Sequence, residues 1–236
     1  MGLGYMGGKS QIAQKIVHTI SPLEPMWWAE GRAWVEPFVG GANVIELVGG
    51  DRYANDLDSE LIALLSAVAN GYLPPASVSR EEYGKVKENP SKYSPEYRGF
   101  VSICCSFGSK KWGSYASNAR GNNYARAGMR ALGRMRRTLQ DIVLSSVDYK
   151  NMHIPENSII YCDPPYLGTA GYAPEGFNHD EFWEWCRERS SEGHSVFVSE
   201  YGGPDDFHLL WSHKVKVTMG PTSNSTAKEE RLFMAP

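Results

Sequence analysis

The residues best suited to chemistry are consecutive: Asp163, Pro164, Pro165 and Tyr166, directly after the apolar run Ile159–Cys162. The run predicts a short buried strand. Because two prolines cannot continue a hydrogen-bonded ladder, we expect the chain to leave the sheet at Asp163. In an open α/β sheet, ligands bind where strands end at their carboxyl side. This exit therefore brings a carboxylate, a stiff turn and an aromatic ring to a candidate site.

The four residues suit the activation of an exocyclic amine on a nucleobase, whose lone pair is delocalised into the ring. The Asp163 carboxylate and the Pro164 carbonyl can each accept one N–H, which favours a pyramidal nitrogen with its lone pair directed at an electrophile. The Tyr166 ring offers a face for an unstacked base. The alternative is a plain Pro-Pro turn with Asp163 capping the next segment, and four residues alone do not decide between the two.

Another unit able to bind a ligand begins at the strand predicted over Ala33–Phe38. Val39-Gly40-Gly41 ends this strand, and a short helix is expected over Ala42–Val48. A strand, a glycine turn and a helix form the start of a nucleotide-type site, since glycines let a ligand approach the backbone closely.

The next strand is predicted over Arg52–Asp56 and ends in an acid, before a helix over Leu57–Ala69. An acid at this place is suited to hold ribose hydroxyls. Asp56 could also cap the following helix, and the two roles are compatible.

The N-terminal stretch Gly2–Ser10 is rich in glycine and precedes a helix predicted over Gln11–Ile20. Its Gly-Gly-Lys-Ser ending does not make a P-loop, because Leu3 stands where glycine is required and no strand precedes it. A turn remains that carries Tyr5 and Lys9 at a helix N-terminus, where anions bind readily. An ordered N-terminal arm is the plainer interpretation.

Composition excludes several classes of protein. The net charge of −3 excludes a globally basic nucleic-acid binder, so any such binding must use a local patch. No apolar run approaches the roughly 20 residues of a membrane span, and no signal-peptide pattern begins the chain. The cysteines and histidines show neither metal nor disulfide spacing, so we expect no metal and a reduced, cytoplasmic location.

One local patch does exist, because the stretch from Arg98 to Gln140 holds no acidic residue. Its basic residues are interleaved with aromatic ones, which is typical of a phosphate-binding surface. Its arginines at positions 126, 130, 134 and 137 fall on one face of a predicted helix. A solvated basic face is the alternative. The candidate contacts are Lys110, Lys111, Arg120, Arg126, Arg130, Arg134 and Arg137.

The C-terminal third completes an α/β pattern. A glycine-containing loop over Leu167–Asn178 is followed by a helix over His179–Arg189 and a strand over His194–Tyr201. Two final strands are predicted over Lys214–Gly220 and Arg231–Ala235.

In order, the motifs are Tyr-Met-Gly-Gly-Lys, Glu-Pro-Phe-Val-Gly-Gly, Asn-Asp and Asp-Pro-Pro-Tyr. The chain thereby resembles the Dam-type DNA adenine-N6 methyltransferases in their α motif order. The resemblance implies a Rossmann-like α/β sheet, mostly parallel with a C-terminal antiparallel strand pair. It also implies a catalytic domain over residues 1–70 and 141–236 and a small helical and loop insertion for target recognition over residues 71–140.

The resemblance also implies roles for single residues. Asp163, Pro164, Pro165 and Tyr166 would be catalytic. The family often has tryptophan where this chain has Tyr5, and its recognition signature is not recognisable here, so no target sequence carries over. The residues expected to bind the cofactor S-adenosylmethionine are Tyr5, Lys9, Glu36, Pro37, Phe38, Gly40, Asp56, Asp148 and Asp163.

The activity implied is methylation of adenine N6 in double-stranded DNA. A monomer is the default expectation, which the residues do not test. The alternatives are another nucleobase amine, namely RNA adenine N6 or cytosine N4, or a silent nucleic-acid-binding module of the same fold. Serine commonly stands at the Asp163 position in cytosine-N4 enzymes, which argues against that alternative. The compact chain would fit a phage or mobile-element enzyme. The residues decide neither this origin nor whether a restriction partner exists.

Overall fold

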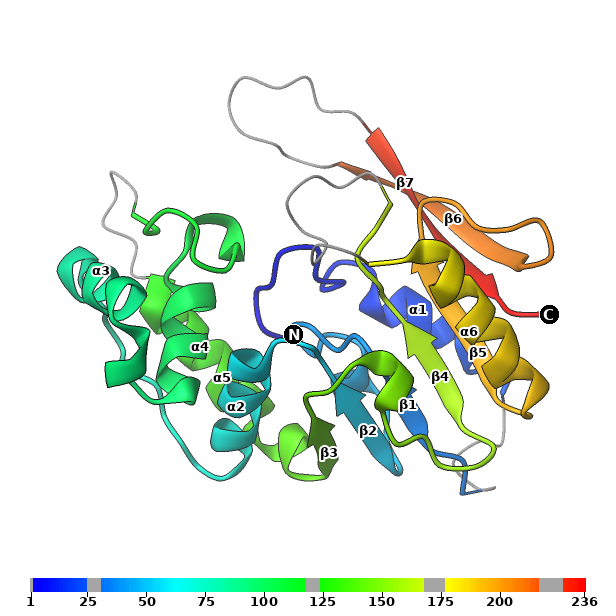
Figure 1. The fold of residues 1–236 in the computed structure, drawn as a ribbon, viewed down its shortest axis with the longest axis horizontal. Coiled ribbons are helices and arrows are strands. Elements are labelled where there is room, and N and C mark those ends of the chain that lie inside the picture. The colour runs from blue at the N-terminus through cyan, green and yellow to red at the C-terminus, as the bar shows by residue number, and fades with distance from the viewer. Residues whose placement is uncertain (1, 25–30, 118–123, 168–176, 217–226) are drawn as a thin grey trace.

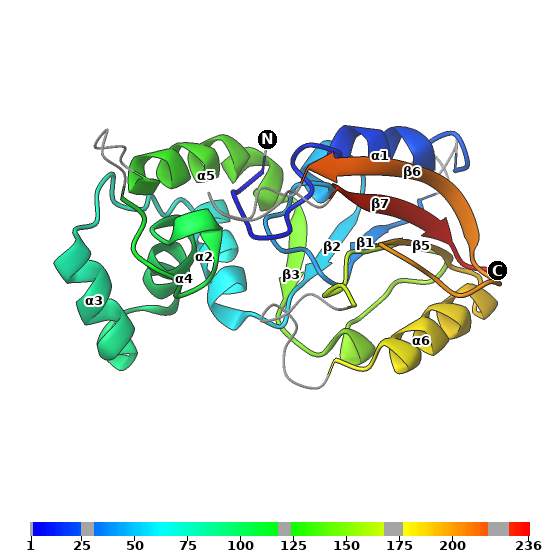
Figure 2. The same ribbon diagram turned by 90° about the horizontal axis from the view of Figure 1, so that it is seen from above.

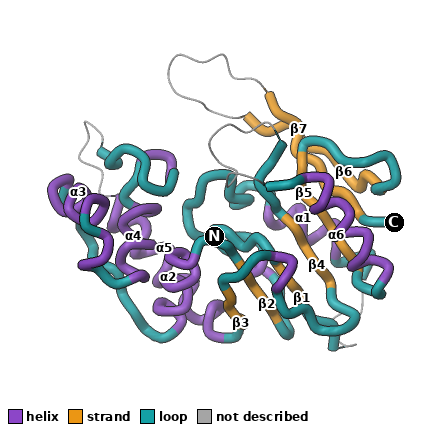
Figure 3. Tube along the Cα trace, in the orientation of Figure 1, coloured by secondary structure: helices purple, strands orange, loops and turns teal. Residues whose placement is uncertain are grey.

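The protein is described by a computed structural model over residues 2–24, 31–117, 124–167, 177–216 and 227–236. Strands gather in one part of the molecule and helices α2 to α5 in the other (Figures 1 and 3). The two parts meet at the edge strand β3, beside helix α2.

The sheet has seven strands in the order β3-β2-β1-β4-β5-β7-β6. The first five are parallel, and β7 runs antiparallel to both β5 and β6. This topology confirms the expected fold class. The strands are β1 (Trp34–Glu36), β2 (Arg52–Asn55), β3 (Ile142–Ser145), β4 (Ile159–Cys162), β5 (Ser195–Glu200), β6 (His208–Lys216) and β7 (Ala227–Met234).

Helix α1 (Ala13–Ile20) lies on one face of the sheet and α6 (His179–Ser191) on the other (Figure 2). Side chains along each strand point alternately to the two faces of the sheet, and so they form two cores. Trp34 packs in the core that includes α1, and its neighbour Val35 packs in the core that includes α6. The central strands β1 and β4 therefore bury their side chains on both faces, as expected for strands covered on both sides.

The strand order reverses between the parallel neighbours β1 and β4, since β2 and β3 follow on one side and β5 on the other. Such a switch point opens a crevice at the carboxyl ends of the strands, where α/β proteins bind ligands. The residues after β1 and β4 lie at this place.

The helical part is built from α2 (Ser59–Ala69), α3 (Arg80–Glu88), α4 (Pro95–Cys104) and α5 (Tyr124–Gln140). Helix α4 was not expected from its sequence. Ser94 is its N-cap residue and Pro95 its first helical residue, a favourable start. Gly99 lets it cross α2 closely, because a Cβ there would lie 2.2 Å from the Glu60 carbonyl oxygen.

Some expected boundaries were wrong. The helix predicted over Ala42–Val48 is only a 3₁₀ turn over Ile45–Leu47, since Ala42 has a left-handed φ of 54° that no α-helix accommodates. Strand β6 begins at His208, before the expected Lys214, because pairing with β7 extends it. Residues 168–176, within the expected loop Leu167–Asn178, lie outside the described residues. So do residues 217–226, which include the end of the strand expected over Lys214–Gly220.

Candidate active site

Lys9 and Asp163 form the centre of the site. The Lys9 Nζ lies 2.6 Å from Asp163 Oδ1 and 3.4 Å from Glu230 Oε1. It also lies 4.5 Å from the centroid of the Tyr166 ring, within cation–π range. The N-terminal arm reaches this position because the Leu3 N–H donates to the Gly41 carbonyl, 3.0 Å away, beside the turn after β1.

Tyr166 is a buried side chain held from two sides. Its hydroxyl donates to Glu230 Oε1, and its ring meets that of Tyr201 edge to face with centroids 4.6 Å apart. Glu230 lies on β7, far from the catalytic motif in sequence, and sequence reasoning missed it. No motif signals a lone glutamate on a terminal strand.

Burial controls the charges here. Burial raises the pKa of Asp163 to about 6, against the opposing effect of the Lys9 ammonium and with a further rise from Glu230. Burial alone would lower the pKa of Lys9, but the carboxylates of Asp163 and Glu230 outweigh it and the pKa is raised. Lys9 is therefore charged, and Asp163 titrates close to neutral pH.

Glu36 ends β1 as a buried acid. Its Oε1 accepts from Trp34 Nε1 at 2.9 Å. Burial raises the pKa of Glu36 to about 8, with a smaller rise from Asp163. Glu36 is therefore mostly protonated at pH 7 in this structure, and it can donate as well as accept.

The turn after Glu36 and Pro37 needs its glycines. Gly40 has a φ of 46°, and a Cβ there would lie 3.1 Å from Tyr5 Cδ1, so the Tyr5 ring packs directly over this residue. A Cβ at Gly41 would lie 2.5 Å from the Leu3 carbonyl oxygen. Phe38 leaves the turn toward α6, with its ring centroid 5.2 Å from that of Tyr149, which gives it a packing role.

Asp56 lies directly after β2. Its Oδ2 accepts from the Gly40 N–H at 3.0 Å, and its Oδ1 from the Asp58 N–H at 2.9 Å. Burial raises the pKa of Asp56 to about 6, and Lys111 opposes that rise. The cap of α2 is Asp58, which accepts from the Glu60 and Leu61 N–H groups, so Asp56 does not cap the helix.

Asn55 joins three strand ends, and sequence reasoning assigned it no role in the site. Its Nδ2 donates to the carbonyls of Pro37 at 3.1 Å and Val147 at 2.9 Å, and its Oδ1 accepts from the Val147 N–H at 3.0 Å. Asp148 directly follows Val147, and the Asp148 Oδ1 accepts from the Lys150 N–H at 3.0 Å. The Asp148 carboxylate thus caps the turn Tyr149–Asn151.

Glu200, at the end of β5, is a further missed residue. Its Oε2 accepts from the Leu167 N–H at 3.3 Å and its Oε1 from the Tyr201 N–H at 2.7 Å. Burial raises the pKa of Glu200 to about 7, with further contributions from Asp163 and Glu230. It fixes the backbone directly after Tyr166.

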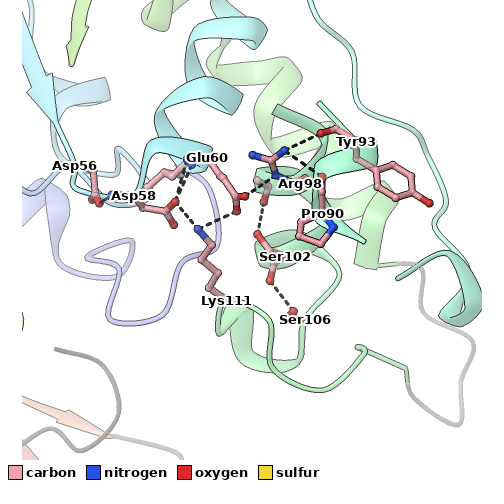
Figure 4. Close-up of polar contacts among 11 residues, drawn as sticks. Asp56, Asp58, Glu60, Pro90, Tyr93, Arg98, Ser102, Ser106 and Lys111 are labelled. Atoms are coloured by element: carbon pink, nitrogen blue, oxygen red, sulfur yellow. Dashed lines mark hydrogen bonds and ion pairs between the residues drawn. The ribbon is translucent and has the colours of Figure 1, made fainter. Parts of the chain in front are cut away.

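The basic candidates fall into two groups. Arg126, Arg130, Arg134 and Arg137 are all exposed on α5, opposite a buried face that includes Leu132 and Met135. Lys110 is also exposed. Lys111 differs from these exposed residues, since Asp58 and Glu60 already bind its ammonium and make it less available to phosphates (Figure 4). Arg120 lies outside the described residues.

The part of the chain that the structure describes contains no cluster of three or more side chains able to hold a metal ion. Within the same residues, no helix is both long enough and apolar enough to cross a membrane.

The fold defines a doubly wound α/β protein, with a candidate ligand site at the switch point between β1 and β4. Residues 5–97 match the family model described as D12 class N6 adenine-specific DNA methyltransferase. This match confirms the predicted resemblance over a stretch that holds Lys9, Glu36 and Asp56 and ends before Asp163.

A curated relative, the retron Ec67 DNA adenine methylase of Escherichia coli, is 39% identical over 61 residues. That alignment covers 24% of this chain and 21% of the relative, so the chain matches about a fifth of that protein's length. A solved structure, SMU.472, provisionally described as a methyltransferase and complexed with SAH, is 12% identical with a TM-score of 0.33. The match covers 99% of this chain and 56% of that one, and at this score it supports no argument about the site.

Proposed function

We propose that the protein transfers a methyl group from S-adenosylmethionine to adenine N6 in duplex DNA. One observation carries the proposal: the Asp163–Tyr166 motif follows β4 at the switch point, beside the turn after β1 that belongs to the matched family stretch. A nucleobase amine and an activated methyl group would meet at this crevice.

The residues after β1 and β2 fit the cofactor. Gly40 and Gly41 let the Tyr5 ring and the Leu3 carbonyl lie directly against the turn, which holds the N-terminal arm beside the proposed cofactor position. Asp56 accepts one hydrogen bond on each oxygen, which leaves further lone pairs for ribose hydroxyls. Tyr5, Lys9, Glu36, Pro37 and Asp148 surround the same strand ends. S-adenosylmethionine supplies the methyl group on a sulfonium, already activated for transfer.

The chain's own task is then to hold and polarise the amine. Asp163 accepts one N6–H, and the Pro164 carbonyl accepts the other. The Lys9 ammonium engages Asp163 Oδ1 and keeps the carboxyl ionised at neutral pH. As positive charge develops on the nitrogen, the preorganised carboxylate stabilises it. One N6 proton must leave after transfer, and a carboxylate with a pKa of about 6 is suited to take it.

Tyr166 provides the surface for the base. Its hydroxyl is anchored to Glu230 and its edge rests on Tyr201, so the ring is held in one orientation before any base arrives. A preoriented ring loses little entropy on stacking with a flipped adenine.

Residues 71–140 are proposed as the target-recognition insertion. The exposed arginine face of α5 and Lys110 are suited to DNA phosphates. Lys111 is left out of this surface because carboxylates already bind it. We propose that the protein acts as a monomer in the cytoplasm.

The test is methyl transfer from radiolabelled S-adenosylmethionine to unmethylated duplex DNA and, separately, to RNA, with nucleoside analysis of the product. We expect N6-methyladenine in DNA with the unaltered protein and none with Asp163→Ala. N4-methylcytosine, or label in RNA alone, would replace the proposed substrate. Cofactor binding without any transfer would identify a silent module of the same fold.

A further inference from the structure

A polar network joins the insertion to the start of α2 (Figure 4). The Lys111 Nζ lies 2.5 Å from Asp58 Oδ1 and 3.0 Å from Glu60 Oε2. Arg98, on α4, holds the other oxygen of Glu60, with Nε 2.6 Å from Oε1. Two basic residues of the insertion thus bind the first turn of α2.

The same turn supports the acid of the cofactor site. Asp58 caps α2 with its side chain, while its N–H donates to Asp56 Oδ1 at 2.9 Å. The carboxylate of Asp58 and the ammonium of Lys111 are the charged groups acting on Asp56. Asp58 raises the pKa of Asp56 and Lys111 lowers it, in addition to the larger rise caused by burial.

The insertion determines where Lys111 lies. Its neighbour Trp112 donates its N–H to the Ser102 carbonyl at 3.0 Å and accepts from Lys87 Nζ at 2.8 Å. The Tyr83 hydroxyl donates to the Gly113 carbonyl at 2.9 Å. Trp112 has a left-handed φ of 52°, which these bonds stabilise. Helices α3 and α4 therefore fix the loop that presents the ammonium.

We propose that Lys111 is a positioning residue for the ribose-binding acid Asp56, and that it couples the insertion to the cofactor site. The inference rests on the function proposed above, in which Asp56 receives the ribose hydroxyls. The opposing possibility is that the ion pairs only fasten the insertion to α2.

Three variants separate these possibilities. Lys111→Met removes the charge and keeps most of the side chain, and Lys111→Arg keeps the charge. Lys85→Met is the matched control, because it removes another lysine ion pair of the insertion. In this pair on α3, the Lys85 Nζ lies 2.7 Å from Glu81 Oε1. Each protein is measured by thermal unfolding, by ¹³C NMR titration of the Asp56 carboxyl, and by calorimetry with S-adenosylmethionine from pH 5 to 8.

We expect Lys111→Met to move the Asp56 titration upward by a few tenths of a pH unit, the size of a partly exposed ion pair. Affinity for S-adenosylmethionine should fall roughly two- to fivefold near pH 6 and less at pH 8. Lys111→Arg keeps the charge, so its Asp56 titration and its affinity for S-adenosylmethionine should match those of the unaltered protein. Lys85→Met should change neither quantity.

A lower unfolding temperature in Lys111→Met, with an unmoved Asp56 titration and an unchanged pH profile of affinity, would overturn the inference. The NMR titration needs no cofactor. If the unaltered protein binds no S-adenosylmethionine at any pH, the proposed function fails, while the titration still decides whether Lys111 acts on Asp56.

Discussion

Lys9 and Asp163 come from distant parts of the chain, and their Nζ and Oδ1 atoms lie 2.6 Å apart in the candidate site. Both side chains are largely buried, at 7% and 19% exposure. A buried pair of this kind is costly to separate, because removing one partner leaves the other uncompensated. The N-terminal arm is therefore part of the candidate site.

Replacing Asp163 should affect chemistry more than binding. Asp163→Asn keeps a hydrogen-bond acceptor and loses the negative charge, so we expect the single-turnover methylation rate to fall at least about 100-fold. Asp163→Ala should be slower still. Both should bind cofactor and DNA, as measured by calorimetry and gel shift. A near-normal rate in Asp163→Ala would make this residue a structural turn residue.

Removing Lys9 should change the pH dependence of the rate. In the proposed mechanism Asp163 acts as a carboxylate, so activity should rise with pH through its pKa of about 6. Lys9 lowers this pKa and Glu230 raises it. Lys9→Met should therefore move the acid limb of the kcat/KM profile upward, by about one pH unit or more. Lys9→Arg should move it less. If the acid limb of the profile does not move, Lys9 does not control the ionisation of Asp163.

Two changes at Tyr166 should separate its ring from its hydroxyl. Tyr166→Ala should cost roughly 1–3 kcal/mol of base stacking, and a 2-aminopurine target should show a smaller fluorescence rise on binding. Tyr166→Phe keeps the ring and loses the bond to Glu230, so its loss should be smaller. Glu230→Gln should resemble Tyr166→Phe. Equal defects in Tyr166→Phe and Tyr166→Ala would contradict a stacking role.

Asp56 should matter for the cofactor. Asp56→Ala should weaken S-adenosylmethionine binding by roughly 1–3 kcal/mol, because two ribose hydroxyls lose their acceptor. Calorimetry measures this directly, with Asp51→Ala, an exposed acid before β2, as control. An unchanged affinity would remove Asp56 from the site.

The arginine face of α5 should set the salt dependence of DNA binding. Changing Arg126, Arg130 and Arg134 together to glutamine should flatten the slope of log affinity against log salt by about two to three, and leave cofactor affinity unchanged. Arg187→Gln, an arginine on α6 outside the insertion, serves as the control. If the slope stays the same, the face is only solvated.

Local patterns were enough for the order of elements and for most of the candidate site. Apolar runs ended by Gly or Pro-Pro mark β1 and β4, because neither a left-handed turn nor two prolines continue a ladder. The carboxyl ends of parallel strands meet at one edge of a sheet, so the sequence alone places the motifs after them close together. The arginine spacing likewise predicted an exposed face, which α5 has.

The packing of elements that are distant in sequence determined the rest of the candidate site. Glu230 and Glu200 face Tyr166 and Leu167 only because β5 lies beside β4 and β7 beside β5, and isolated glutamates carry no local signal of such neighbours. Lys111 was expected at a DNA surface, yet α4 and its loop direct it to Asp58. A charge's partner depends on which elements pack together, and spacing along the chain does not specify that packing.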